Sequence, residues 1–122
     1  MKSLSSYREL MVWQKSMDLT LSIYELTRGF PSEEKFGITS QMRRACASIP
    51  ANIAEGQARR TTGEFLASLG IARGSLAELE TFLNLSERLG YLSKKDSESS
   101  LSACVEINKM LNALMRSLST RH

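Results

Sequence analysis

Apolar residues recur at three- and four-residue steps along most of the chain, and this spacing predicts α-helices. The clearest run lies in the third quarter of the chain, where steps of four, three, four, three and four residues form a heptad seam. The seam consists of Phe65, Leu69, Ala72, Leu76, Leu79 and Leu83. No segment shows the strict alternation of apolar and polar residues that marks a strand. The pattern therefore predicts an all-α protein.

Turn residues and capping residues divide this pattern into four predicted helices. They span residues 7–28, 33–60, 61–89 and 93–119. Gly29 is placed to end the first helix, and Gly90 is placed to end the third. Thr61 and Glu64 have the spacing of a capping box, which marks the start of the third helix.

The connections between the predicted helices are short, so successive helices must run antiparallel. We therefore predict a single domain over residues 1–122, an up-down-up-down antiparallel four-helix bundle, with flexible ends at 1–6 and 120–122. A chain of 122 residues can bury a sufficient core without disulfides or metals. Cys46 and Cys104 lie within apolar stripes, and we expect two reduced, buried thiols rather than a disulfide.

Two features of the predicted helices concern their packing. The apolar stripe of the first helix consists of Leu10, Trp13, Met17, Leu21 and Tyr24, and Leu19, Ile23 and Leu26 widen it. The third helix carries a row of small residues, namely Gly63, Ala67, Gly70 and Gly74. An interior glycine destabilises a helix by about 1 kcal/mol relative to alanine, so the row predicts that another helix approaches closely there. The alternative is that the glycines lie on the surface and are tolerated. Surplus apolar side chains on the last two helices predict self-association.

The second predicted helix contains a proline, Pro50, within an otherwise regular apolar pattern. Proline has no N–H, and its ring clashes with the carbonyl of Cys46, at a cost of about 3 kcal/mol. The apolar pattern nevertheless continues through Ile53, so we predict a kinked helix that packing holds together. The freed carbonyl of Cys46 then needs a partner from a side chain or from water.

A set of polar and small residues surrounds this proline. It consists of Ser48, Asn52, Glu55, Gly56 and Arg59. Four-residue spacing places Ser48, Asn52 and Gly56 on one face, whereas Glu55 can pair with Arg59. One interpretation is that the set repairs the kink and contacts the third helix, through Ser75 and Glu78. The alternative is a site for a small ligand or for nucleic acid at Pro50.

Positive charge is concentrated in one part of the chain, although the net charge is only +3. Residues 28–60 carry +3, whereas residues 61–90 carry −2. The pairs Arg43–Arg44 and Arg59–Arg60 lie about 24 Å apart along a straight helix, a span that can contact several phosphates. The secondary candidates for phosphate contact are Arg73, Lys94 and Lys95. The alternative is that these arginines are solvated or form salt bridges with the acidic third helix.

The chain offers few residues for catalysis or metal binding. His122 is the only histidine, and the chain has no Cys-x-x-Cys, no His-Glu-x-x-His and no glycine-rich phosphate loop. We therefore expect no metal, no cofactor and no enzymatic activity. There is no charged-then-apolar leader and no apolar run long enough to cross a bilayer. We expect a cytoplasmic protein without a membrane partner.

The stretch SIPANIAEG at Ser48–Gly56 is the most specific motif of the chain. Together with LMVWQK at Leu10–Lys15 and IARGSLAE at Ile71–Glu78, it resembles a bacterial family of proteins encoded in intervening sequences of 23S rRNA genes. The resemblance implies a four-helix bundle that assembles into homopentameric rings, with no established biochemical activity. Such bundles are also similar in fold to the accessory variability proteins of diversity-generating retroelements. Those proteins are basic pentamers that bind nucleic acid and a reverse transcriptase.

The charge pattern and the resemblance lead to one principal hypothesis. It is a non-enzymatic homopentameric bundle that binds structured RNA or another nucleic acid through repeated basic patches. The residues expected to make those contacts are Arg43, Arg44, Arg59 and Arg60. The competing hypothesis is an oligomeric scaffold whose partner is another protein. A third hypothesis places a small-molecule site at the Pro50 kink.

Overall fold

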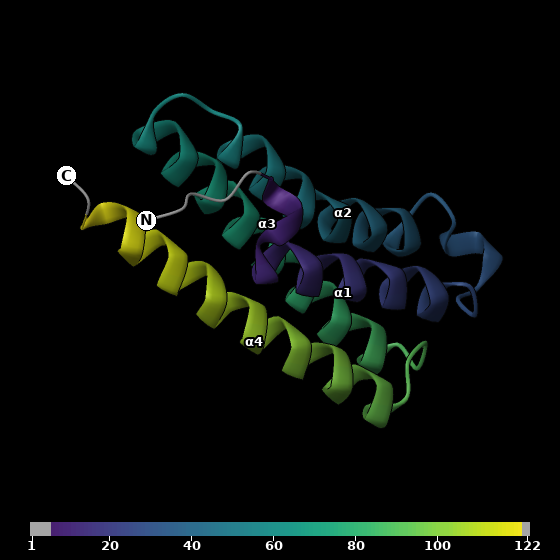
Figure 1. The fold of residues 1–122 in the computed structure, drawn as a ribbon. Coiled ribbons are helices and arrows are strands. Elements are labelled where there is room, and N and C mark those ends of the chain that lie inside the picture. Colours follow the sequence, from purple (N-terminus) through teal and green to yellow (C-terminus); the bar gives the residue numbers. More distant parts are fainter. Residues whose placement is uncertain (1–5, 121–122) are drawn as a thin grey trace.

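A computed structural model describes residues 6–120, and within this range the chain forms four α-helices and two short 3-10 helices (Figure 1). The elements are η1 (Tyr7–Glu9), α1 (Met11–Thr27), η2 (Ser32–Glu34), α2 (Ile38–Gln57), α3 (Thr62–Arg88) and α4 (Lys94–Ser119). Each α-helix packs on the next, and α4 also packs on α1, which closes the bundle. The predicted all-α four-helix bundle is therefore confirmed. Among the helices of residues 6–120, none has both the length and the hydrophobicity that a membrane span requires.

The ends of the described range are capped. Ser6 accepts a hydrogen bond from the backbone N–H of Arg8 and thereby begins η1. Thr120 is the C-cap of α4. The rest of the predicted flexible ends, residues 1–5 and 121–122, lies outside the described residues.

The core follows the heptad seam predicted in α3. Five of the six seam residues are buried, namely Leu69, Ala72, Leu76, Leu79 and Leu83, and Phe65 is half-buried. The capping box at Thr61 and Glu64 is present, and Gly90 adopts a φ of +80° just after α3 ends. Both cysteines are free and buried in this core. Burial raises the pKa of the Cys46 thiol to about 11 and that of the Cys104 thiol to about 12, so both are protonated at neutral pH.

Helix α1 faces the core with Leu19 and Ile23, which widen the predicted stripe, rather than with the centre of that stripe. The buried residues are Val12, Ser16, Leu19, Ile23 and Thr27. The centre of the predicted stripe lies to one side of them: Met17, Leu21 and Tyr24 are exposed, and Leu10 and Trp13 are half-buried. Burial of the two hydroxyls is possible because each donates to a carbonyl of its own helix. Ser16 Oγ donates to Trp13 O at 2.9 Å, and Thr27 Oγ1 donates to Ile23 O at 2.7 Å.

The limits of the first two helices also differ from those predicted. The predicted first helix is interrupted at Leu10, whose extended backbone separates η1 from α1. The second begins at Ile38 rather than at residue 33, because Gly37 has a non-helical backbone with φ −107° and ψ −120°. Helix α2 then continues through Pro50 to Gln57, as the apolar pattern predicts.

The glycine row of α3 does not contact another helix of this chain. A Cβ built on Gly63, Gly70 or Gly74 would meet no atom within 4 Å. The predicted close approach is therefore wrong within the chain, and these glycines face solvent. Close approach occurs instead at Gly56 of α2, which is buried. A Cβ there would lie 2.8 Å from both Phe65 Cδ1 and Ser68 Cβ of α3.

Candidate functional site

The polar set beside Pro50 joins α2 to α3. Ser48 Oγ and Ser75 Oγ lie 2.9 Å apart, so the predicted contact with the third helix through Ser75 is present. Asn52 Nδ2 donates to Ser48 O at 2.8 Å and to Ser48 Oγ at 3.0 Å, which fixes the serine from its own helix. Glu78 is exposed and makes no hydrogen bond or ion pair with this set in the described chain. Its predicted part in the contact is wrong.

The backbone carbonyl that Pro50 leaves free in α2 finds its partner on α1 and not in the polar set. Thr20 Oγ1 lies 3.3 Å from Cys46 O, the carbonyl that proline leaves without its helical partner. The same hydroxyl lies 2.8 Å from Ser16 O and 3.4 Å from Cys46 Sγ. The sequence predicts that the carbonyl needs a partner, but it gives no sign that Thr20 supplies it, because the two residues lie on different helices.

The four arginines of the principal hypothesis are not equivalent. Arg43 is half-buried: its guanidinium lies 4.6 Å over the Tyr24 ring, and its Nε donates to Thr27 Oγ1 at 2.8 Å. Arg59, which follows the C-terminal end of α2, is ion-paired with Glu55 of that helix. The other two are exposed, Arg44 with a hydrogen bond to Gln41 and Arg60 in the loop before α3.

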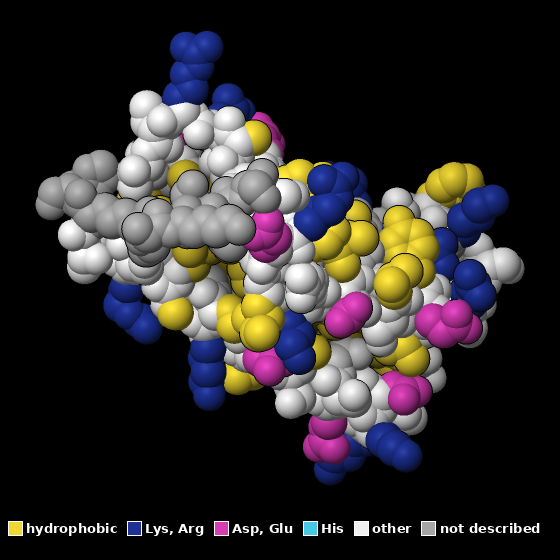
Figure 2. All heavy atoms as spheres, viewed as in Figure 1, with side chains coloured by type: hydrophobic (Ala, Val, Ile, Leu, Met, Phe, Trp, Pro, Cys, Tyr) yellow, Lys and Arg dark blue, Asp and Glu magenta, His cyan; other side chains and the backbone are white. Residues whose placement is uncertain are grey.

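None of these arginines forms a salt bridge with α3. The ion pairs of residues 6–120 join Lys15 with Glu106, Arg28 with Glu25, and Arg59 with Glu55. The predicted alternative of salt bridges to the acidic third helix is thus wrong for this part of the chain. On the face shown in Figure 2, Lys and Arg side chains stand largely apart, with hydrophobic side chains exposed between them.

A polar cleft between α3 and α4 brings together two arginines. It has a volume of about 520 Å³ and is lined by Arg73, Asn112, Met115, Arg116, Ser119 and Thr120. Arg73 Nη1 donates to Asn112 Oδ1 at 2.9 Å, which orients one guanidinium across the cleft. Neither Arg73 nor Arg116 has an ion-pair partner within residues 6–120.

The surroundings of this cleft are basic. Residues 65–77 contain one charged side chain, Arg73, and residues 107–120 contain only Lys109 and Arg116. The cleft lies at the end of the bundle where α4 finishes, and the loop between α2 and α3 lies at the same end (Figure 1). Arg60 is therefore placed at the same end, whereas Lys94 and Lys95 begin α4 at the opposite end. Arg116 is not among the predicted residues, because the sequence pattern of α4 emphasises its apolar seam.

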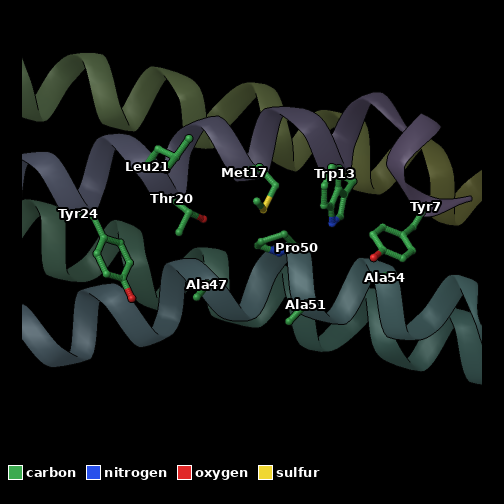
Figure 3. A pocket seen from close by; sticks show the side chains of 10 residues that line it. All are labelled: Tyr7, Trp13, Met17, Thr20, Leu21, Tyr24, Ala47, Pro50, Ala51 and Ala54. Atoms are coloured by element: carbon green, nitrogen blue, oxygen red, sulfur yellow. The ribbon is translucent and has the colours of Figure 1, made fainter.

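A second hollow, which we call the α1–α2 groove, lies on the other side of Pro50 (Figure 3). Its volume is about 520 Å³. It is lined by Tyr7, Trp13, Met17, Thr20, Leu21, Tyr24, Ala47, Pro50, Ala51 and Ala54. Figure 3 shows large side chains of α1 facing short alanine side chains of α2, so the helices leave space between them. Four residues of the predicted α1 stripe thus form one wall of this groove, namely Trp13, Met17, Leu21 and Tyr24.

The groove has no charged lining residue, but a guanidinium lies at each end of it. Arg8 lies 4.8 Å over the Tyr7 ring, and Arg43 lies 4.6 Å over the Tyr24 ring. Tyr7 also contacts Trp13 edge to face, with ring centroids 5.2 Å apart. In residues 6–120, no three His, Cys, Asp or Glu side chains gather in a way that could hold a metal ion.

Comparison with known proteins identifies relatives of the chain. The family model described as 23S rRNA-intervening sequence protein matches residues 8–113. A crystal structure of a protein of unknown function from the S23 ribosomal protein family of Bacteroides thetaiotaomicron is similar, with a TM-score of 0.78 and 29% sequence identity. The similarity covers 86% of this chain and 98% of that one. No curated protein matches the chain.

Proposed function

Because the chain belongs to the family of 23S rRNA-intervening sequence proteins, we propose that it is a non-enzymatic homo-oligomer that binds structured RNA or another nucleic acid. The contacts are made by basic side chains that recur in every copy. A pentamer is the assembly that the resemblance implies.

The observation that carries the proposal is the Arg73–Arg116 cleft. Two guanidinium groups without carboxylate partners in the described chain line a cleft that also contains amide and hydroxyl groups. Guanidinium, amide and hydroxyl groups are the side chains that contact phosphate oxygens most often. Arg60 lies at the same end of the bundle, whereas Arg59 is paired with the carboxylate of Glu55 and Arg43 is half-buried against Tyr24 and Thr27. The proposal therefore keeps Arg60 and Arg73 from the predicted residues, adds Arg116, and leaves out Arg43 and Arg59 as main phosphate contacts.

The test is binding of the purified protein to a labelled structured RNA and to a duplex DNA across a salt series. Removal of one phosphate contact should reduce the slope of log K against log salt by about 0.9 for duplex DNA and by less for single strands. A triple variant with Arg60→Glu, Arg73→Glu and Arg116→Glu should bind more weakly and with a smaller slope.

A matched control carries the same change in charge at the opposite end of the bundle. It combines Arg88→Glu, Lys94→Glu and Lys95→Glu, three exposed positions. The control should retain most of the slope of the unmodified protein. Absence of binding at low salt would contradict nucleic-acid binding, and equal reductions in both variants would contradict the assigned surface.

A second candidate function is an oligomeric scaffold for another protein. It is favoured by the apolar side chains that remain exposed, Met17, Leu21 and Tyr24 among them. Light scattering at micromolar concentration tests the assembly that both functions require. A pentamer has five times the 13.6 kDa mass of one chain, and a mass of 13.6 kDa would contradict self-association.

A further inference from the structure

The most exposed large hydrophobic side chain in the described part of the chain is Phe36, whose surface is 88% accessible. It lies in the turn at residues 35–37, between η2 and α2. Burial of a large aromatic side chain is favourable, so the exposed ring of Phe36 is available for a contact with another molecule.

The turn that carries Phe36 is held in place on both sides. Glu34 Oε2 accepts a hydrogen bond from Tyr91 Oη at 2.8 Å, and Glu34 Oε1 accepts one from the backbone N–H of Ile38 at 3.3 Å. The backbone N–H of Gly37 donates to Glu34 O at 2.9 Å, which closes the turn. Phe36 is therefore presented on a fixed turn, and its binding would cost little ordering of the backbone.

The α1–α2 groove has the chemistry to receive an aromatic ring. Its walls are aromatic and aliphatic, its α2 side consists of alanines and Pro50, and it has no charged lining residue. Its volume of about 520 Å³ exceeds that of one phenylalanine side chain, so neighbouring residues of the turn can enter with it. Phe36 does not fill the groove of its own chain, because the ring is almost fully exposed. A Phe36 ring that enters this groove would therefore belong to a second copy.

The charges around the two surfaces are complementary. The groove has Arg8 at one end and Arg43 at the other. The turn carries Glu33, which is exposed and has no ion pair within the described residues, and Glu34. Lys35 Nζ lies 5.5 Å over the Phe36 ring and has to move aside when the ring docks, which is easy for a long and flexible lysine side chain.

We infer that Phe36 of one copy inserts into the α1–α2 groove of a second copy. The inference rests on the self-association included in the proposed function and names the surfaces that carry it. The contact joins two different surfaces. After one contact, the copy that supplied its ring still has a free groove, and the copy that supplied its groove still has a free ring. Such a head-to-tail contact closes into a ring when the rotation per copy permits it.

The experiment measures mass by analytical ultracentrifugation for the unmodified protein and for two variants. Phe36→Ser removes the inserted ring, and Leu21→Glu places a charge in the groove. Both positions are exposed, at 88% and 66%, and circular dichroism should show unchanged helix content. Each variant alone should sediment as one chain of 13.6 kDa.

A mixture of the two variants tests whether the ring and the groove are partners of each other. The Phe36→Ser chain keeps an intact groove and the Leu21→Glu chain keeps an intact ring, so one contact can form between them. The mixture should sediment at twice the mass of one chain and no higher. As a control, Val105→Glu changes another exposed hydrophobic residue, 48% accessible on α4, and should leave the assembly intact.

Failure of the inference can be distinguished from failure of self-association itself. If the unmodified protein is monomeric, self-association and this contact are both wrong. If the unmodified protein assembles and Phe36→Ser keeps its full mass, the assembly stands and this contact is overturned. A mixture that remains at the mass of one chain would also overturn it.

Discussion

Helix α2 packs on α3 and on α1 in opposite ways. Toward α3 it presents Ser48, Asn52 and Gly56, and the two helices meet so closely that a Cβ at Gly56 would collide with Phe65 and Ser68. Toward α1 it presents Pro50 and three alanines, and these small side chains leave a groove open between the two helices. Small side chains therefore do not by themselves bring helices together.

The difference lies in the residues that the neighbouring helix offers. Ser75 of α3 supplies a hydroxyl that pairs with Ser48, so close approach is stabilised by a hydrogen bond. Helix α1 instead offers large side chains, Met17, Leu21 and Tyr24, which hold the surfaces apart at this level. One side of α2 stabilises the fold, and the other side remains available to a partner.

Shortening a side chain to alanine should affect the free energy of unfolding much more at a buried position than at a position that lines the groove. Ile49→Ala removes a side chain that is fully buried beside Pro50 and should reduce the free energy of unfolding by about 2–5 kcal/mol. Leu21→Ala, at 66% exposure, should change it by less than about 0.5 kcal/mol. Urea denaturation at a protein concentration where the assembly is fixed measures both. Similar reductions at the two positions would show that the groove wall contributes to the core.

Substitution of glycine by alanine compares Gly56, which contacts α3 closely, with Gly70, which contacts no other helix. Gly56→Ala should destabilise the protein by about 1–3 kcal/mol, because the new methyl group has no room beside Phe65 and Ser68. Gly70→Ala should stabilise it by about 0.5–1 kcal/mol, because the helix gains a better helix former in open space. Thermal unfolding of the pair should show shifts of opposite sign. A stabilising Gly56→Ala would mean that α2 and α3 are farther apart than described.

The hydrogen bond between Ser48 and Ser75 should contribute less to the free energy of unfolding than the buried Ile49 side chain does. A double-mutant cycle with Ser48→Ala and Ser75→Ala is expected to give a coupling of about 0.5–1.5 kcal/mol in the free energy of unfolding. Ser99→Ala and Ser102→Ala, at two exposed positions on α4, form a suitable control cycle. Additive effects at Ser48 and Ser75 would contradict the hydrogen bond.

A similarly small effect on stability is expected where Thr20 contacts the Cys46 carbonyl. Thr20→Val leaves the Cys46 carbonyl without its hydroxyl partner and should cost about 1 kcal/mol of unfolding free energy. In a Pro50→Ala background, the backbone N–H of residue 50 can bond that carbonyl, so the same substitution should cost less. Equal costs in both backgrounds would show that Thr20 acts through Ser16 alone.

The bundle could be predicted from the sequence because its strongest signals are local. The heptad seam of α3, the capping box at Thr61 and the continuation of α2 past Pro50 each depend on residues within one helix. The family resemblance in Ser48–Gly56 agrees with these signals, and the family match over residues 8–113 confirms it.

The parts that could not be predicted depend on contacts between helices. The predicted apolar stripe of α1 is wide, and only packing against the other helices decides that Leu19 and Ile23 are buried while Leu21 is exposed. The pairing of Thr20 with Cys46 and of Arg73 with Asn112 spans 26 and 39 residues, which helical periodicity cannot detect. The same limit explains why the sequence does not show that Arg43 packs against Tyr24 and Thr27 of α1, whereas the local pair of Glu55 and Arg59 could be predicted.

The most direct test of the proposed function is the salt dependence of RNA binding by the unmodified protein and by the Arg60, Arg73 and Arg116 triple variant. We expect an affinity that falls steeply with salt, and a clearly smaller slope for the triple variant than for the Arg88, Lys94 and Lys95 control. No binding at low salt, or a slope that the triple variant leaves unchanged, would contradict the proposed function.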